Sequence, residues 1–235
     1  MSPERLARIN AMLDMRQPDL TICLEDVHKP HNLSAMIRTA DAIGVPEVHA
    51  VFLGEDNRLR GNTATGSQQW IKVHRHRNIE SAVSRMREQG MQVIATNLSD
   101  TAVDFREVDY TKPTAILMGQ EKTGISAEAL ALADQDVIIP MVGMVQSLNV
   151  SVASALLLYE AQRQRQAAGM YGQRRLDEAE CQRLLFEGGH PIFAKICRQK
   201  GLPYPRIDEE GQIQAPDEWW QKVQMNKSSW QHLDD

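Results

Sequence analysis

Residues 114–149 read TAILMGQEKTGISAEALALADQDVIIPMVGMVQSLN. An apolar run at 114–119 ends in a polar loop, a helical pattern follows at 126–133, and a second apolar run at 136–140 ends in another loop. Continuous runs of Val, Ile and Leu are typical of parallel strands that are buried on both faces. A helix is the usual connection between two parallel strands. This stretch therefore predicts an α/β fold.

The same alternation of strands and helices extends outward from this stretch. Further strands are predicted at 20–24, 48–53, 71–74 and 91–96, and further helices at 32–43, at 79–89 and from about 147 to 167. Asn32 is a good N-cap for the first of these helices. We expect an open, mostly parallel sheet with its helices across residues 20–167. Helical extensions are expected to flank it at 1–19 and 168–235.

Composition limits the class of protein. Hydrophobic residues make up 42% of the 235 residues, which is enough for a packed core. The apolar runs are too short to span a bilayer, and the N-terminus lacks the pattern of a secretory signal. The three widely spaced cysteines argue against a disulfide framework. We expect a cytoplasmic protein without a membrane partner. The net charge is −5, but the charges are unevenly distributed, and Lys and Arg are in excess in two segments, at 71–91 and 161–200.

Three of the predicted strands end in loops rich in polar residues and glycine. The sequence TNLS begins at the last residue of the 91–96 strand, GQEKTG begins at Gly119, and MVGMVQSLN follows the 136–140 strand. In open α/β sheets, ligands bind outside the carboxyl ends of the strands. Loops of this composition can hold a ligand through backbone groups. The sequence therefore predicts a binding site at this edge of the sheet.

Several common sites are not supported by the sequence. Gly119 and Gly124 have the glycine spacing of a phosphate loop, but the lysine that reaches the phosphates is absent. No strand is followed by the dinucleotide-binding pattern of three glycines. Cys23, His28 and His31 lie close together in sequence, but no second Cys/His pair completes a tetrahedral set. We therefore expect the protein to bind neither a nucleoside triphosphate nor a metal ion.

Three segments match known motifs in order: NLSAMIRTADAIG at 32–44, ILMGQEKTGI at 116–125 and IIPMVGMVQSLNVSVA at 138–153. Together they resemble the SpoU family of RNA ribose 2′-O-methyltransferases, within the SPOUT superfamily. The flanking segments resemble the tRNA-modifying TrmH type within that family. These segments are HKPHN at 28–32, YEAQRQR at 159–165, LLFEGG at 184–189 and KGLPYP at 200–205.

The resemblance implies a fold, a reaction and partners. The fold is an α/β core with a C-terminal trefoil knot, and the cofactor is S-adenosyl-L-methionine, bound in a bent form. The active site would form at the subunit interface of a homodimer, and the substrate would be the ribose of guanosine 18 in the D-loop of tRNA. Two alternatives remain open. One is a ribosomal-RNA ribose 2′-O-methyltransferase of the same family, and the other is a non-catalytic RNA-binding protein with the same fold.

The resemblance also implies roles for individual residues. The catalytic candidates are Arg38, Asn32, Glu121, Ser147 and Asn149. Each has a simpler interpretation from the residues alone. Arg38 could form a surface ion pair with Asp41, one helical turn away. Asn32, Ser147 and Asn149 could simply cap helices, with Ser147 the stronger cap of the last two, and Glu121 could be a solvated loop carboxylate.

Cofactor and RNA contacts are predicted in separate regions. The cofactor candidates lie at the strand ends and in the loop before the long helix: Thr96, Gly119, Ile139 and Leu148. Ile139 and Leu148 would supply apolar walls and backbone groups for an adenine ring. The candidates for phosphate contacts are basic side chains on the long helix and near the N-terminus: Arg163, Arg165, Arg5, Arg8 and Arg16. The alternative for each arginine is a solvated surface position.

Overall fold

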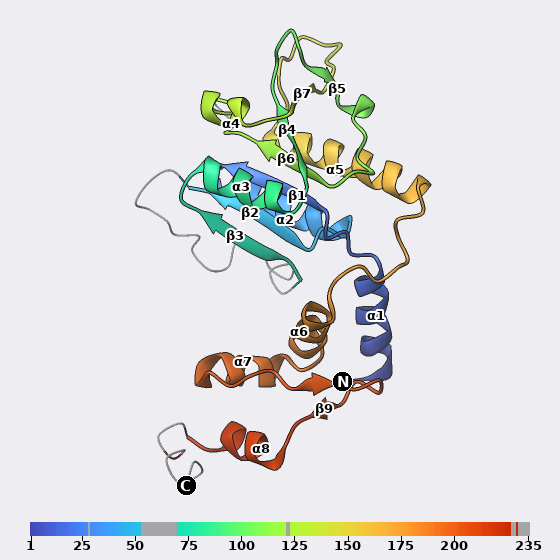
Figure 1. The fold of residues 1–235 in the computed structure, drawn as a ribbon, viewed down its shortest axis with the longest axis vertical. Helices are drawn as coiled ribbons and strands as arrows, with labels where there is room; N and C mark the ends of the chain where they lie inside the picture. The colour runs from blue at the N-terminus through green and yellow to red at the C-terminus, as the bar shows by residue number, and fades with distance from the viewer. Residues whose placement is uncertain (28, 53–69, 121–122, 227–228, 230–235) are drawn as a thin grey trace. The chain divides into compact units, whose positions relative to one another are not determined.

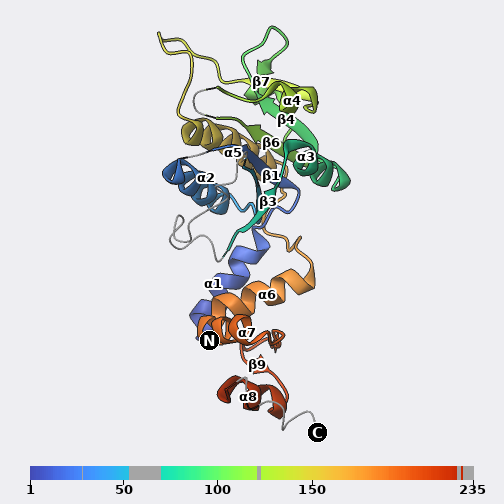
Figure 2. The same cartoon turned by 90° about the vertical axis from the view of Figure 1, so that its left-hand side faces the viewer.

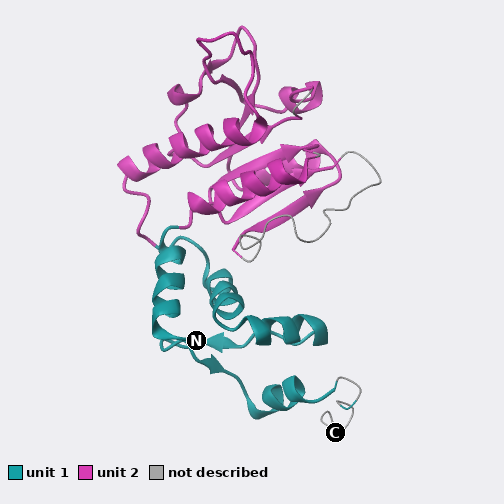
Figure 3. Cartoon of the chain, turned by 180° about the vertical axis from the view of Figure 1, so that it is seen from behind, with its two compact units in different colours: residues 1–15, 174–235 teal, residues 16–173 magenta. Residues whose placement is uncertain are grey.

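The computed structural model describes residues 1–27, 29–52, 70–120, 123–226 and 229. The chain forms two compact units, one comprising residues 16–173 and the other residues 1–15 with 174–235 (Figure 3). The two terminal extensions, predicted at 1–19 and 168–235, fold together as one unit, because the N-terminal helix packs against a helix of the C-terminal extension.

A seven-stranded sheet forms the centre of the larger unit, in the order β3-β2-β1-β6-β4-β7-β5 (Figure 1). Every neighbouring pair is parallel, which confirms the predicted α/β class and open sheet. The strands are β1 (Leu20–Glu25), β2 (Glu47–Val51), β3 (Lys72–His76), β4 (Gln92–Thr96), β5 (Val103–Asp104), β6 (Thr114–Met118) and β7 (Gln135–Ile138). The central strands β1 and β6 are buried along their whole length, as their continuous apolar runs predict.

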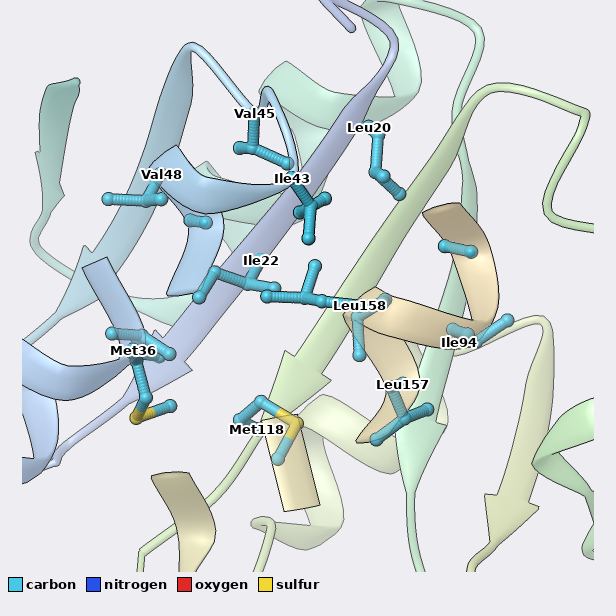
Figure 4. Close-up of a cluster of buried hydrophobic side chains, with 14 of the residues drawn as sticks. Leu20, Ile22, Met36, Ile43, Val45, Val48, Ile94, Met118, Leu157 and Leu158 are labelled. Atoms are coloured by element: carbon cyan, nitrogen blue, oxygen red, sulfur yellow. The ribbon is translucent and has the colours of Figure 1, made fainter. Parts of the chain in front are cut away.

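Helices cover both faces of this sheet (Figure 2). On one face, α2 (Pro30–Ala42) and α5 (Val150–Ala167) pack with one set of strand residues, which includes Ile22 and Met118 (Figure 4). On the other face, α3 (Ile79–Glu88) and α4 (Ala127–Ala131) pack with residues that alternate with the first set along the strands. This alternation follows from the two-residue period of a strand, which sends successive side chains to opposite faces.

Two helices begin at other residues than predicted. Helix α2 begins at Pro30, with Lys29 at the N-cap position, so Asn32 lies in the first turn and is not the cap. Proline is well suited to the first position of a helix because its φ angle is already helical. Helix α5 begins at Val150, and of the two possible caps, Ser147 and Asn149, it is Asn149 that caps the helix.

The smaller unit contains α1 (Pro3–Asp14), α6 (Glu178–Gly189), α7 (Pro191–Lys200) and α8 (Asp217–Gln224). It also holds a short antiparallel pair, β8 (Arg206–Ile207) with β9 (Ile213–Gln214). Arg5 Nε of α1 donates to the carbonyl of Gly188 in α6 at 2.6 Å. Lys200 Nζ donates to three carbonyls at the end of α8, which satisfies acceptors that a helix end leaves open. Within the described residues, no helix has the length and apolarity needed to cross a membrane.

Three histidines gather where β2 pairs with the edge strand β3. His49 Nδ1 lies 2.8 Å from His76 Nε2, and the ring of His49 stacks on that of His74 at 5.0 Å. His74 Nε2 contacts Glu47 Oε2 at 2.7 Å. Burial, together with the neighbouring histidines and Arg85, lowers the pKa of His49 to about 3. The hydrogen bond from His74 holds the pKa of Glu47 at about 2.

These pKa shifts predict acid-sensitive stability. Folded His49 resists protonation that the unfolded chain accepts below about pH 6.5, so its contribution is present above that pH and is lost as pH falls. Glu47 contributes in the same direction between its ordinary pKa of 4.5 and about 2. We expect the free energy of unfolding to fall by up to about 1.4 kcal/mol per pH unit for each proton taken up.

Urea titrations from pH 7.5 to pH 4.5 measure this slope. His49→Asn is expected to flatten it, whatever its effect on stability at neutral pH. His31→Asn is the control, because that side chain is exposed and lies outside the cluster. An identical slope in wild type and His49→Asn would contradict the prediction.

Candidate functional site

The ends of three neighbouring strands meet at one edge of the sheet, as the prediction required. Thr96 ends β4, Gly119 directly follows β6 and Ile139 directly follows β7, and β4 lies between the other two. Asp136 accepts hydrogen bonds from Asn97 Nδ2 at 3.0 Å and Ser99 Oγ at 2.9 Å. These contacts hold the segment after β4 against β7. Three of the four predicted cofactor residues therefore lie along one edge.

The loop after β6 closes on itself. Gln120 and Gly124 exchange two backbone hydrogen bonds, at 2.9 and 3.1 Å. A Cβ atom at Gly119 would lie 2.3 Å from the backbone of Gly124 and of Ile125, so this position requires glycine. Gly124 has a φ of +71°, which also favours glycine. Glu121, a predicted catalytic residue within this loop, lies outside the described residues.

Two carboxylates at the end of β1 hold this loop, and the sequence analysis missed both. Glu25 accepts hydrogen bonds from Ser126 N at 2.9 Å and Ser126 Oγ at 2.6 Å. Asp26, which has a left-handed φ of 53°, accepts one from Gln120 Nε2 at 2.6 Å. Both carboxylates are buried. Consecutive acidic residues directly after a buried strand were the signal that could have found them.

The segment before α5 brings two predicted catalytic residues together. Asn149 Nδ2 donates to Asn32 Oδ1 at 3.3 Å, which joins the first turn of α2 to the N-cap of α5. Asn149 Oδ1 accepts from Ser151 N at 2.8 Å, so this one amide both caps the helix and contacts Asn32. Asn32 is buried, Asn149 and Ser147 are exposed, and Leu148 is half-buried.

Arg38 is exposed on α2. The alternative interpretation, an ion pair with Asp41, is wrong, because Asp41 Oδ1 instead accepts from Arg16 Nη2 at 2.9 Å. Within the part of the chain that the structure describes, the Arg38 guanidinium has no ion-pair partner. Its donors are therefore open to an external ligand such as a phosphate or a ribose hydroxyl.

The prediction that Arg165 contacts RNA is wrong. Its side chain is fully buried and pairs with Asp19 Oδ1 at 2.5 Å. The guanidinium also donates to Gln17 Oε1 and to the carbonyls of Tyr110, Lys112 and Asp19. A buried guanidinium needs such a set of acceptors. Arg165 is therefore a core residue that ties the end of α5 to the chain beside β1 and β6.

Arg16 is likewise a buried residue rather than a surface cation. Its guanidinium donates to the carbonyls of Val45 and Trp70 and pairs with Asp41. A phosphate cannot reach a side chain that is enclosed in this way, so Arg16 is also removed from the predicted RNA contacts.

The other three predicted basic contacts are exposed. Arg163 forms a bidentate ion pair with Glu160 on the same helix, at 2.7 and 2.9 Å, which offsets its charge. Arg5 and Arg8 are exposed on α1 of the smaller unit. In the described ranges, three or more His, Cys, Asp or Glu side chains nowhere gather in a geometry that could hold a metal ion.

Comparison with known proteins agrees with this architecture. The model of the SpoU rRNA methylase family matches residues 19–159, and the model of a C-terminal SpoU rRNA methylase segment matches residues 163–216. The tRNA (guanosine(18)-2′-O)-methyltransferase of Escherichia coli K12 is 65% identical over 226 residues, which cover 95% of this chain and 99% of that protein.

Two solved structures extend the comparison. The TrmH/SpoU tRNA-modifying enzyme of Aquifex aeolicus superposes with a TM-score of 0.73 at 40% identity, covering 80% of this chain and 96% of that one. An rRNA methyltransferase from Sinorhizobium meliloti, crystallised with AdoMet bound, has a TM-score of 0.56 at 36% identity, covering 65% and 59%. With its parallel sheet, its glycine loop after β6 and its matched core, the chain belongs to the SpoU rRNA methylase family.

Proposed function

We propose that this protein transfers the methyl group of S-adenosyl-L-methionine (AdoMet) to the ribose 2′-oxygen of guanosine 18 in the D-loop of tRNA. The observation that carries the proposal is the near full-length match to a relative named for that reaction. The proposal includes a cytoplasmic location and the family's trefoil knot. The knot is supported by the match to the SpoU family and its solved structures.

The residues proposed for the cofactor are Thr96, Gly119, Ile139 and Leu148. They suit an adenosine because the close-packed Gly119 loop offers backbone groups, and the half-buried Ile139 and Leu148 offer apolar contact. When bound, AdoMet supplies an activated methyl group on sulfur and leaves as a neutral thioether. The chain therefore needs no acid for the leaving group.

The remaining requirement is to place the 2′-hydroxyl in line and to accept its proton. An arginine keeps its proton in proteins, so Arg38 is proposed to orient the ribose hydroxyl and a neighbouring phosphate, whose oxygen takes the proton. The pair of Asn32 and Asn149 holds the start of α2 beside the start of α5. Exposed Ser147, together with Glu121, is proposed to complete the substrate contacts.

We infer that the protein is a homodimer and that α5 forms part of the interface. Val152, Leu156 and Tyr159 are 47%, 40% and 52% exposed and lie on one stripe of α5. Their spacing of four and three residues places them on the same helix face. In the preceding segment, Val142 and Met144 are almost completely exposed. Exposed apolar surface of this kind marks interaction sites.

A charge within this stripe is expected to separate the subunits. Leu156→Glu should give a monomer at micromolar concentration in analytical ultracentrifugation, because a desolvated carboxylate at an apolar interface costs several kcal/mol. Ser84→Glu, at an exposed position of α3 on the opposite face of the sheet, is the control and should stay dimeric. A wild-type protein that sediments as a monomer, or an unchanged mass for Leu156→Glu, would contradict the assignment.

The reaction itself is tested with labelled AdoMet and RNA transcripts. Methyl transfer is expected to a tRNA carrying G18, not to the same tRNA with A18 and not to ribosomal RNA. The modified nucleotide should resist alkaline cleavage, since the 2′-oxygen that starts cleavage is blocked. Label in ribosomal RNA alone would favour the other substrate class of the family. Tight RNA binding without any transfer would favour the non-catalytic alternative.

A further inference from the structure

Glu25 makes an unusual contact at the edge of the sheet where the strands end. Glu25 is the last residue of β1, and it is 4% exposed. Both of its oxygens accept hydrogen bonds from one residue, Ser126, through the backbone N–H and the hydroxyl. Ser126 Oγ in turn accepts from Ala129 N at 3.0 Å and thereby caps α4. A buried carboxylate is stable only where such donors meet it, so the contact fixes Ser126 against β1.

The same strand end also holds the other end of the loop. Asp26 accepts from Gln120 Nε2, and Gln120 is bonded through its backbone to Gly124. Gln120 and Ser126 are therefore tied to two consecutive residues, Glu25 at the end of β1 and Asp26 directly after it. The close approach of Gly119 to Gly124 exists only while the loop keeps this closed form.

Glu25 has no ion-pair partner among the described residues, so charge neutralisation does not explain it. Its neighbours on this face of the sheet, Cys23 and Val51, belong to an apolar cluster. An aliphatic side chain would pack there without the desolvation that a carboxylate costs. What the carboxylate adds is the directed pair of hydrogen bonds to Ser126.

We propose that Glu25 is a positioning residue for methyl transfer, which acts through Ser126 to hold the Gly119 loop in the form that binds AdoMet. The inference rests on the proposed function, and it adds a residue that does not itself touch the cofactor. Loss of the contact should weaken cofactor binding and leave the chemical step at saturating AdoMet nearly unchanged.

Calorimetry with AdoMet, combined with steady-state kinetics on the tRNA transcript, tests this assignment. Glu25→Ala is expected to raise the Kd for AdoMet about tenfold or more, the loss that hydrogen bonds to a charged group predict. The kcat at saturating AdoMet should stay within about threefold, since the lost interaction serves binding. Glu25→Gln is expected to restore most of the affinity, because its amide can accept from Ser126 N and donate to Ser126 Oγ.

Ser126→Ala is an independent test of the same contact, and it remains informative if Glu25→Ala does not fold. It should also raise the Kd for AdoMet. The Kd of the double variant should be no more than about twofold above that of Glu25→Ala, because both changes break the same contact. Full additivity of the two changes would overturn the assignment.

Asp134→Ala is the matched control. Asp134 also accepts from a backbone N–H, that of Val93 at 2.7 Å, but it lies at the amino end of β7. This variant should keep the wild-type Kd for AdoMet. If Asp134→Ala raised the Kd as much as Glu25→Ala does, the assignment would be overturned, because the effect would then reflect a general loosening of the sheet. Wild-type protein that fails to bind AdoMet would overturn the proposed function itself. Wild type that binds, with Glu25→Ala binding equally well, would overturn only the role of Glu25.

Discussion

Arg165→Ala is expected to destabilise the larger unit by about 3–5 kcal/mol, the range for removing one partner of a buried ion pair. The side chain is fully buried, and its guanidinium holds Asp19, Gln17 and the carbonyls of Tyr110 and Lys112. Alanine would take away these donors together and leave a cavity in the core. Such a loss is a large fraction of the stability of an ordinary domain.

Urea denaturation followed by circular dichroism measures the change. Arg163→Ala is the control on the same helix, two residues away, because its ion pair with Glu160 is exposed and should contribute less than about 1 kcal/mol. If Arg165→Ala keeps the wild-type midpoint and loses only tRNA affinity, then Arg165 is a surface contact and its buried position here is wrong.

The role of Arg165 was predicted wrongly from the sequence. The basic excess of 161–200 favours an RNA contact, whereas the position of Arg165 along α5 indicates burial. The buried residues of this helix include Leu157, Leu158 and Ala161, and Arg165 continues the same stripe. Helical periodicity therefore indicated a buried side chain. The partners that make burial of a charge possible come from segments about 50 and 150 residues away, which no local pattern reveals.

The sheet was predictable because its central strands are buried on both faces and carry continuous apolar runs. The short strands β5, β8 and β9 were missed, since two residues give no recognisable alternation. The edge of the candidate site was also predictable, because parallel strands end on one side. The contacts of Glu25 and Asp26 depend on how a loop about 100 residues later folds back, and only the structure supplies that.

Helix starts were predicted from residue type alone, which explains the errors at α2 and α5. Asn32 and Ser147 are both suitable caps, yet Pro30 begins one helix earlier and Asn149 caps the other. The correction bears on function, because it frees the Asn32 side chain from capping. Its Oδ1 instead accepts the hydrogen bond from Asn149 that links the two helices.

Arg38→Ala is expected to lower the rate of methyl transfer by about 10²- to 10⁴-fold, the range for groups that assist proton transfer in the transition state. The kcat should fall while the Kd for AdoMet stays close to wild type, since Arg38 is proposed to contact the ribose and phosphate of the substrate and is not among the residues proposed for the cofactor. Because the side chain is exposed, the substitution should leave the midpoint of urea denaturation unchanged.

Arg38→Lys separates charge from geometry: a lysine keeps the charge but loses the planar set of donors that can hold a hydroxyl and a phosphate together. We expect Arg38→Lys to recover little of the rate. Single-turnover transfer to the G18 transcript measures the effect, and a rate near wild type for Arg38→Ala, in protein that binds AdoMet normally, would remove Arg38 from the mechanism.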